Sequence, residues 1–139
     1  IGRSTTSRTL RATACACDGM LRITGLCGRY PKPGIAAAKQ NAEPSRSILL
    51  SHYPAVIKDL LALSGRNRPR FDLTLTGHSH GGQIRLPFLG ALFLPFWVEG
   101  YVRGWYTTPA GPMYVNVGLG TTALPLRFLC RPEIAVFDI

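Results

Sequence analysis

The chain has 139 residues, 46% of them hydrophobic, and its 16 Lys and Arg residues outnumber 7 Asp and Glu residues to give a formal net charge of +9. Such a chain can form one domain with a buried core, which excludes a largely disordered protein. The basic residues are spread along the whole sequence, and only residues 66–70 are locally dense in them. Because nucleic-acid binding requires a concentrated basic surface, we expect no nucleic-acid partner.

The cysteine pattern indicates the cellular compartment, and the first residue bears on whether the chain is complete. Cys15, Cys17, Cys27 and Cys130 form neither a C-x-x-C pair nor the spacing of a disulfide framework, which favours a reducing, cytoplasmic location. The chain begins with Ile1, and no apolar signal segment follows. We therefore expect a fragment or a processed product of a longer protein.

The first 41 residues divide into a leader and the start of a folded domain. Residues 1–20 show no clear period and are expected to form a poorly structured leader before a domain at residues 21–139. The apolar pattern predicts a strand at 21–26, and a Pro-rich break precedes a short predicted helix at 35–41.

A strand, a helix and a second strand follow. Residues 47–51 and 71–76 have the pattern of strands, and between them Val56, Leu60 and Leu63 recur at helical spacing until Ser64-Gly65. This order is typical of a βαβ unit and predicts an α/β fold.

The second half of the sequence predicts short strands separated by Gly and Pro, which indicate hairpins or a second sheet. These strands are expected at residues 83–86, 100–106, 113–117 and 133–139.

A strongly apolar segment, residues 86–98, lies between the first two of these strands. It is too short to span a bilayer and contains Pro87 and Pro95. Two interpretations stay open: a loop folded over the core, or a lipid-facing surface beside the active site. With the net charge, the second raises an alternative function, a non-catalytic basic and apolar module that binds anionic membranes.

All three histidines lie in two short motifs, Ser-His-Tyr-Pro at 51–54 and Gly-His-Ser-His-Gly-Gly-Gln at 77–83. Each motif follows a predicted strand, where α/β proteins tend to carry functional groups. Histidine is also the commonest metal ligand, and rigid strand ends would hold its ring in place. Ligands this closely spaced suit a two-metal site, in which the ions lie roughly 3.5–4 Å apart.

The second motif also satisfies G-x-S-x-G, the nucleophile elbow of serine hydrolases, with Ser79 as the nucleophile. Those enzymes need a general-base histidine well after the serine, and His80, the only later histidine, is too close. Gly81, Gly82 and Pro87 also interrupt the helix that the elbow should open. We therefore disfavour a serine hydrolase.

The two motifs resemble the last two metal motifs of the calcineurin-like metallophosphoesterases. Downstream residues narrow the resemblance to the bacterial, membrane-associated YkuE/YaeI-like branch, and the similarity covers about residues 21–139, the family's C-terminal portion. The downstream stretches with comparable sequence are residues 83–87, 114–116, 118–121, 124–128 and 131–134.

The resemblance implies the C-terminal half of a β-sandwich flanked by helices, and an enzyme that hydrolyses phosphomonoester, phosphodiester or pyrophosphate bonds with a metal-activated hydroxide. It assigns His52 and His78 to one of two divalent metal ions (Mn, Zn or Fe) and His80 to the other. Asn116 and Gly118 would shape the substrate pocket. The implied substrate is a phosphorylated small molecule or a phosphorylated lipid, with peripheral contact to the inner membrane as an open alternative to a purely cytoplasmic location.

The chain departs from the family pattern in its first part. The earlier motifs of the family, D-x-H, G-D and G-N-H-D/E, do not occur, so no catalytic residue is assigned. Tyr53 stands where many relatives have an acidic or amide residue. Three histidines without a bridging carboxylate should hold two divalent ions poorly. We therefore expect the isolated chain to be weakly active or inactive.

Overall fold

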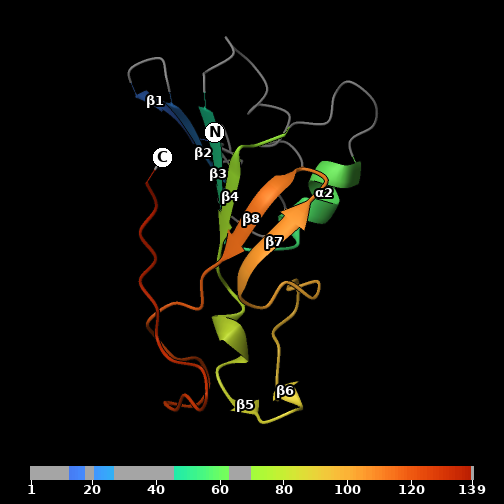
Figure 1. The fold of residues 1–139 in the computed structure, drawn as a ribbon, viewed down its shortest axis with the longest axis vertical. Helices are drawn as coiled ribbons and strands as arrows, with labels where there is room; N and C mark the ends of the chain where they lie inside the picture. Colours follow the sequence, from blue (N-terminus) through green and yellow to red (C-terminus); the bar gives the residue numbers. More distant parts are fainter. Residues whose placement is uncertain (1–12, 18–20, 27–45, 63–69, 139) are drawn as a thin grey trace, which may run out of the picture.

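The structure is a computed structural model that describes residues 13–17, 21–26, 46–62 and 70–138. Its centre is a six-stranded sheet with the order β1-β2-β3-β4-β8-β7, and a separate two-stranded sheet pairs β5 with β6 (Figure 1). The strands of the larger sheet are β1 (Thr13–Cys17), β2 (Leu21–Leu26), β3 (Arg46–Ser51), β4 (Leu73–Thr76), β7 (Gly104–Thr108) and β8 (Gly111–Val115).

The four inner strands of the large sheet run parallel, and only its two edge strands are antiparallel to their neighbours. Helix α2 (Val56–Ala62) connects β3 to β4, which are parallel neighbours. The predicted βαβ unit and the mixed α/β fold are therefore confirmed. The parallel order matters for function because it brings the carboxyl ends of β3 and β4 to the same edge.

The hydrophobic core lies between α2 and one face of the sheet. Val56, Ile57 and Leu60 of the helix are buried against Leu49 of β3 and Met113 of β8. The alternation of side chains along a strand places Met113 and Val115 on this face and Tyr114 on the other. Because α2 has a full apolar face to bury, it packs on the sheet despite its length of only seven residues.

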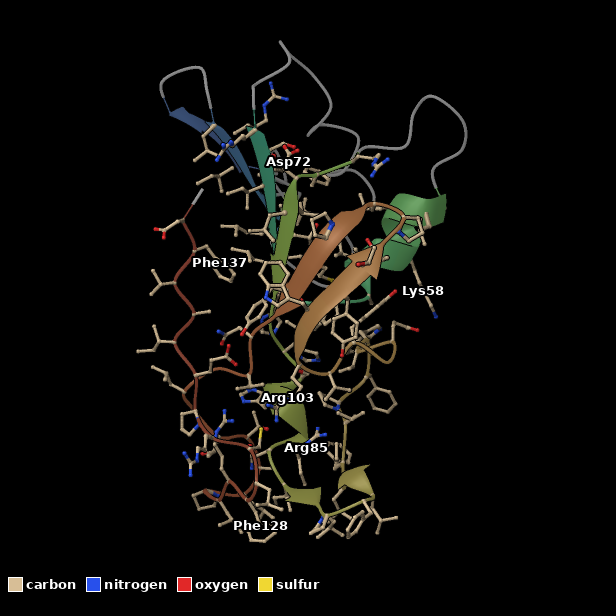
Figure 2. All side chains as sticks on the ribbon, viewed as in Figure 1. Lys58, Asp72, Arg85, Arg103, Phe128 and Phe137 are labelled. Atoms are coloured by element: carbon tan, nitrogen blue, oxygen red, sulfur yellow. The ribbon has the colours of Figure 1, made fainter. Side chains whose placement is uncertain are left out.

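Aromatic side chains cover part of the opposite face of the sheet. Phe137, from the segment at the end of the chain, lies with its ring centroid 5.2 Å from that of Tyr114 and 5.8 Å from that of Trp105. Figure 2 shows this side chain pointing from the terminal segment toward the strands. Residues 133–138 nevertheless form no strand, so the strand expected at 133–139 is wrong over the described residues.

The predicted hairpins of the second half are partly confirmed. β7 and β8 form an antiparallel hairpin, but they join the large sheet beside β4 instead of forming a second sheet. The separate small sheet consists of β5 (Arg85–Leu86) and β6 (Gly90–Ala91), of which only β5 falls within a predicted strand. A short 3-10 turn, η2 (His80–Gly82), connects β4 to this small sheet.

Two further expectations concern the start of the chain. Thr13–Cys17, which we expected to lie in a poorly structured leader, form a strand paired with Leu21–Leu26. The rest of residues 1–20 lies outside the described residues, as does the helix expected at 35–41. The division into a leader and a domain at residue 21 therefore stays a prediction.

Candidate functional site

The histidine motifs lie at the carboxyl edge of the parallel strands. His52 directly follows β3, and His78 comes two residues after β4. The backbone N–H of Gly77 donates to the carbonyl of His52 at 3.3 Å, which ties the two motifs together just beyond the strand ends. Two motifs 26 residues apart therefore meet because parallel neighbouring strands end at the same edge.

His52 and His78 face each other through ring nitrogens. The Nε2 atom of His52 lies 3.1 Å from Nδ1 of His78, and Nε2 of His78 lies 3.0 Å from the carbonyl oxygen of Phe96. Since that carbonyl can only accept, Nε2 of His78 carries the proton and Nδ1 presents its lone pair. A histidine held by a backbone carbonyl on one nitrogen is the usual arrangement for metal ligation through the other.

This pair fits two ligands of one metal ion. With metal–nitrogen bonds of about 2.0–2.1 Å at tetrahedral angles, the two nitrogens would lie about 3.3 Å apart. The observed separation of 3.1 Å needs only a small adjustment. Within residues 13–17, 21–26, 46–62 and 70–138, however, no group of three or more His, Cys, Asp or Glu side chains could hold a metal. Among the described residues the geometry thus brings together two ring nitrogens that fit one ion, and no third such side chain joins them.

The environment of His78 favours the neutral ring that metal binding requires. Partial burial lowers its pKa from the ordinary value of 6.5, and repulsion from His52 and His80 acts in the same direction. The hydrogen bond to the Phe96 carbonyl opposes these effects but does not outweigh them. A neutral imidazole has a free lone pair at physiological pH.

His80 lies on the same loop but does not join this pair. Its Nδ1 atom is buried and has no hydrogen-bond partner within the part of the chain that the structure describes. Its carbonyl is well anchored, because it accepts from the backbone N–H of Gln83 at 2.9 Å and from the thiol of Cys130 at 3.3 Å. A buried ring nitrogen without a partner costs free energy, which fits an atom that awaits a ligand.

The backbone of the second motif is strained. His78, His80 and Gln83 all have positive φ angles, of 65°, 48° and 51°. Each such residue costs on the order of 1 kcal/mol, and strain of this kind tends to gather at functional sites. Gly81 is also required here, because a Cβ atom on it would lie 2.6 Å from Sγ of Cys130.

Ser79 has a structural role. Its side chain is buried, with 1% exposed, and Oγ donates to the Val102 carbonyl at 2.6 Å while accepting from the N–H of Gly81 at 3.1 Å. Within the described residues, no histidine nitrogen is hydrogen-bonded to this hydroxyl. The arrangement lacks the general base that a serine nucleophile requires, in agreement with our rejection of the elbow.

Two polar side chains hold the loop at residues 117–130 against the motif. Gln83 is buried and donates from Nε2 to the carbonyls of Thr122 and Leu124, while its Oε1 accepts from the N–H of Thr122. The Arg127 guanidinium donates to backbone carbonyls that include those of Gly120, at 2.6 Å, and Val117, at 2.8 Å. These contacts hold the loop at residues 117–130 in place beside the second histidine motif.

A cavity of about 780 Å³ opens beside the histidines. The residues that line it are His52, His78, Ser79, His80, Gly82, Gln83, Ile84, Leu92, Phe93, Pro95, Thr122, Ala123 and Leu124. Asn116 and Gly118 are not among them; Oδ1 of Asn116 instead accepts from the N–H of Gly118 at 2.6 Å, within the turn that follows β8. The role that we expected for these two residues in the substrate pocket stays a prediction.

The apolar segment 86–98 lies beside this cavity with most of its large side chains in solvent. The exposed fractions are 108% for Phe88, 81% for Leu89 and 81% for Phe96, whereas Val98 is buried. A loop folded over the core would have buried them, so that interpretation is wrong for these side chains. Among the described residues, no helix has both the length and the apolarity needed to cross a membrane.

Sequence reasoning missed several residues of the site. Trp97 lies against Tyr53, with ring centroids 5.6 Å apart, and Tyr53 contacts the rings of both His52 and His78. Tyr53 therefore supports the histidine pair through aromatic contacts. The backbone carbonyl of Phe96 carries no signal in the sequence, because any residue could have supplied it.

Three known proteins that are similar to this chain have names that refer to a metallophosphoesterase or a phosphodiesterase. The chain is 48% identical to the metallophosphoesterase YkuE of Bacillus subtilis over 93 residues, which cover 67% of this chain and 30% of that protein. It is 38% identical to the phosphodiesterase YaeI of Escherichia coli, covering 66% of this chain and 32% of that protein. A transmembrane protein with a metallophosphoesterase domain from Danio rerio is 36% identical, over 76% of this chain and 23% of that protein.

These matches cover only part of each relative. The chain spans between about a quarter and a little over a third of the length of the curated relatives it matches. No protein-family model and no solved structure matches it. The similarity to YkuE and YaeI nevertheless extends over two thirds of this sequence. The chain belongs to the metallophosphoesterase family, in the branch that includes YkuE and YaeI.

Proposed function

We propose that this chain is the histidine-bearing part of a metal-dependent phosphoesterase that hydrolyses a phosphomonoester, phosphodiester or pyrophosphate bond. The observation that carries the proposal is the His52 and His78 pair, with ring nitrogens 3.1 Å apart at the carboxyl edge of two parallel strands. The names of the relatives support the reaction class, since they are metallophosphoesterases and a phosphodiesterase.

In this proposal each histidine has a defined task. Nδ1 of His78 and Nε2 of His52 bind one divalent ion, Mn, Zn or Fe, and the Phe96 carbonyl keeps the His78 ring in the required tautomer. His80 binds a second ion from the same loop. When bound, such ions supply a hydroxide at neutral pH and positive charge for the phosphoryl oxygens. Ser79 takes no part in the chemistry.

We further infer that these 139 residues alone are weakly active. Two ions need more negative charge than three neutral imidazoles provide, and the family's D-x-H and G-N-H motifs do not occur in the sequence. The catalytic histidine of the family would likewise have to come from outside this chain.

The test is the manganese-dependent hydrolysis of bis(4-nitrophenyl) phosphate by the longer protein that contains this sequence. We expect His78→Ala and His80→Ala each to lower kcat/KM by about 100-fold or more. Even residues that only hydrogen-bond to metal ligands typically contribute about 10- to 100-fold to metal affinity or activity. Asp138→Asn, an exposed change far along the chain, should leave the rate unchanged. Full activity in both histidine variants would defeat the proposal.

A second candidate function, contact with an anionic membrane, is favoured by the exposed side chains of Phe88, Leu89 and Phe96. A second cavity of about 400 Å³ has two basic residues, one acidic residue and three apolar residues in its lining: Arg103, Arg131, Glu133, Val117, Leu129 and Pro132. We expect co-sedimentation with phosphatidylglycerol vesicles that weakens at high salt and in Phe88→Ser. Equal binding to neutral vesicles would contradict an electrostatic contribution, and no binding at all would remove the candidate.

A further inference from the structure

The cavity beside the histidines is larger than a phosphoryl group alone requires. Its volume of about 780 Å³ falls in the roughly 300–1,000 Å³ range of sites that hold whole small molecules. The histidines occupy one part of its lining. Half of the other lining residues are larger apolar residues that we call the apolar wall: Ile84, Leu92, Phe93, Pro95 and Leu124.

The polar side chains of the lining are already engaged with the protein itself. Ser79 bonds to Val102 and Gly81, and both ends of the Gln83 amide are used by Thr122 and Leu124. The hydroxyl of Thr122 also donates to Oε1 of Gln83, at 3.3 Å. Among the described lining side chains, only the imidazoles are left to bind a polar group of a ligand.

The apolar wall and the engagement of the nearby polar side chains together limit which chemical group of a ligand can lie beyond the phosphoryl group. A sugar or a nucleobase would place hydroxyls and ring nitrogens against the apolar wall, where they would lose water without gaining partners. A hydrocarbon group has no polar atoms, so it gives up no hydrogen bonds to water when it lies against this wall. The wall also has surface to bury, because Leu92, Phe93 and Leu124 are 65%, 72% and 57% exposed.

The apolar wall is held in place before any ligand binds. The backbone N–H of Leu92 donates to the Ile84 carbonyl at 2.9 Å, and the backbone N–H of Arg85 donates to the Phe128 carbonyl at 2.9 Å. The short strand β5 thus joins the segment of Leu92 and Phe93 on one side to the loop of Leu124 on the other. Figures 1 and 2 show β5, β6 and Phe128 together at the end of the molecule beyond the sheet.

We propose that the substrate of this site is a phosphoester that carries an alkyl or acyl chain, with its phosphoryl group at the histidines and its hydrocarbon chain along the apolar wall. The proposal rests on the phosphoesterase function above and specifies its substrate class. The shared chemistry is a phosphate joined to a hydrocarbon chain, whether the ester is a free molecule or a phospholipid in a bilayer.

The experiment measures the binding of methyl-, ethyl-, propyl- and butylphosphonate to the longer protein that contains this sequence, by calorimetry in manganese chloride. These compounds share one head group and are not hydrolysed, so the readout does not depend on activity. We expect the affinity to rise about three- to fourfold for each added methylene, or on the order of 30-fold from methyl to butyl.

Leu92→Ser and Phe93→Ser should flatten this dependence on chain length. Both side chains are largely exposed, so neither change should unfold the protein. The matched control is Phe88→Ser, which removes a fully exposed aromatic ring that does not line the cavity and should preserve the dependence. An equal affinity for all four phosphonates, or the absence of binding, would overturn the proposal, as would unchanged chain-length dependence in both wall variants.

A second experiment distinguishes a free ester from a bilayer phospholipid as the molecule that carries the hydrocarbon chain. Co-sedimentation with phosphatidic acid vesicles that butylphosphonate displaces would support a bilayer lipid, and chain-length dependence without vesicle binding would support a soluble ester. The proposed function is tested separately. Suppose that the longer protein hydrolyses methyl 4-nitrophenyl phosphate in a manganese-dependent way but binds all four phosphonates equally. This result would support the phosphoesterase function and contradict a substrate with a hydrocarbon chain.

Discussion

At the scale of single residues, the site depends on which polar atoms are engaged by the protein and which are left for a ligand. Ser79 and Gln83 share a seven-residue motif with His78 and His80, yet their side chains are fully used in holding loops together. Nδ1 of His80, by contrast, is buried without a hydrogen-bond partner among the described residues. The polar residues of one motif therefore differ in whether their side chains are hydrogen-bonded within the described part of the protein.

Ser79→Ala provides a residue-scale test. The change removes the donor to Val102 and leaves the buried N–H of Gly81 without its acceptor, so we expect a loss of about 1–3 kcal/mol in the free energy of unfolding, measured in urea. A fluorophosphonate probe should not label Ser79 in the unchanged protein. Phosphodiester hydrolysis by the longer protein should survive the substitution, whereas loss of a serine nucleophile would lower kcat by about 10⁶-fold.

At the scale of elements, the site is supported by the way in which the hairpin β7–β8 docks beside β4. The turn between these strands packs on Phe71, whose N–H donates to the Ala110 carbonyl at 3.0 Å. β8 then pairs with β4 in parallel, and the N–H of Asn116 donates to the Thr76 carbonyl at 2.8 Å, next to the second histidine motif. The position of the hairpin thus helps to fix the strand end from which His78 projects.

Gly111→Ala tests this docking. Gly111 has a φ angle of 118°, and a Cβ atom on it would collide with the backbone carbonyl oxygen of Phe71. We expect a loss of about 3 kcal/mol or more in the free energy of unfolding, because the backbone cannot move aside without displacing the start of β4. Gly120→Ala is the control, since nothing lies within 4 Å of its Cβ position, and it should change the stability by less than about 0.5 kcal/mol. Similar effects of the two changes would contradict this account.

At the scale of the whole molecule, the chain combines a six-stranded sheet, a pair of facing histidines and many exposed apolar side chains. Ile134 and Val136, near the end of the chain, are 76% and 86% exposed in addition to the side chains beside the cavity. The matched segments make up 25–32% of three of these relatives, YkuE, YaeI and a Helicobacter pylori metallophosphoesterase.

Metal linkage gives a test on the whole chain without any activity. An ion that binds only the folded state stabilises it, and manganese at ten times its dissociation constant should add about 1.4 kcal/mol to the free energy of unfolding. EDTA should reverse the gain. His78→Ala should abolish it, while Asp138→Asn should not. Equal stabilisation of the His78→Ala variant would mean that the ion binds elsewhere.

Local sequence patterns predicted much of the fold. The strands at 21–26 and 47–51, the helix from Val56 and the βαβ order are confirmed, because hydrophobic periodicity reports directly which face of an element is buried. The expected strand at 133–139 failed where described, since its alternating pattern finds no strand partner among the described residues. Strand propensity alone does not supply a pairing edge.

The sequence by itself determined that three histidines lie at strand ends in two motifs similar to those of metallophosphoesterases, because motif spacing is a local property. The tertiary structure decided that His52 and His78 meet with ring nitrogens 3.1 Å apart, that Ser79 is buried, and that the cavity beside them is walled by apolar side chains. These features depend on contacts between residues distant in sequence. Only the parallel pairing of β3 with β4 and the return of later loops bring those residues together.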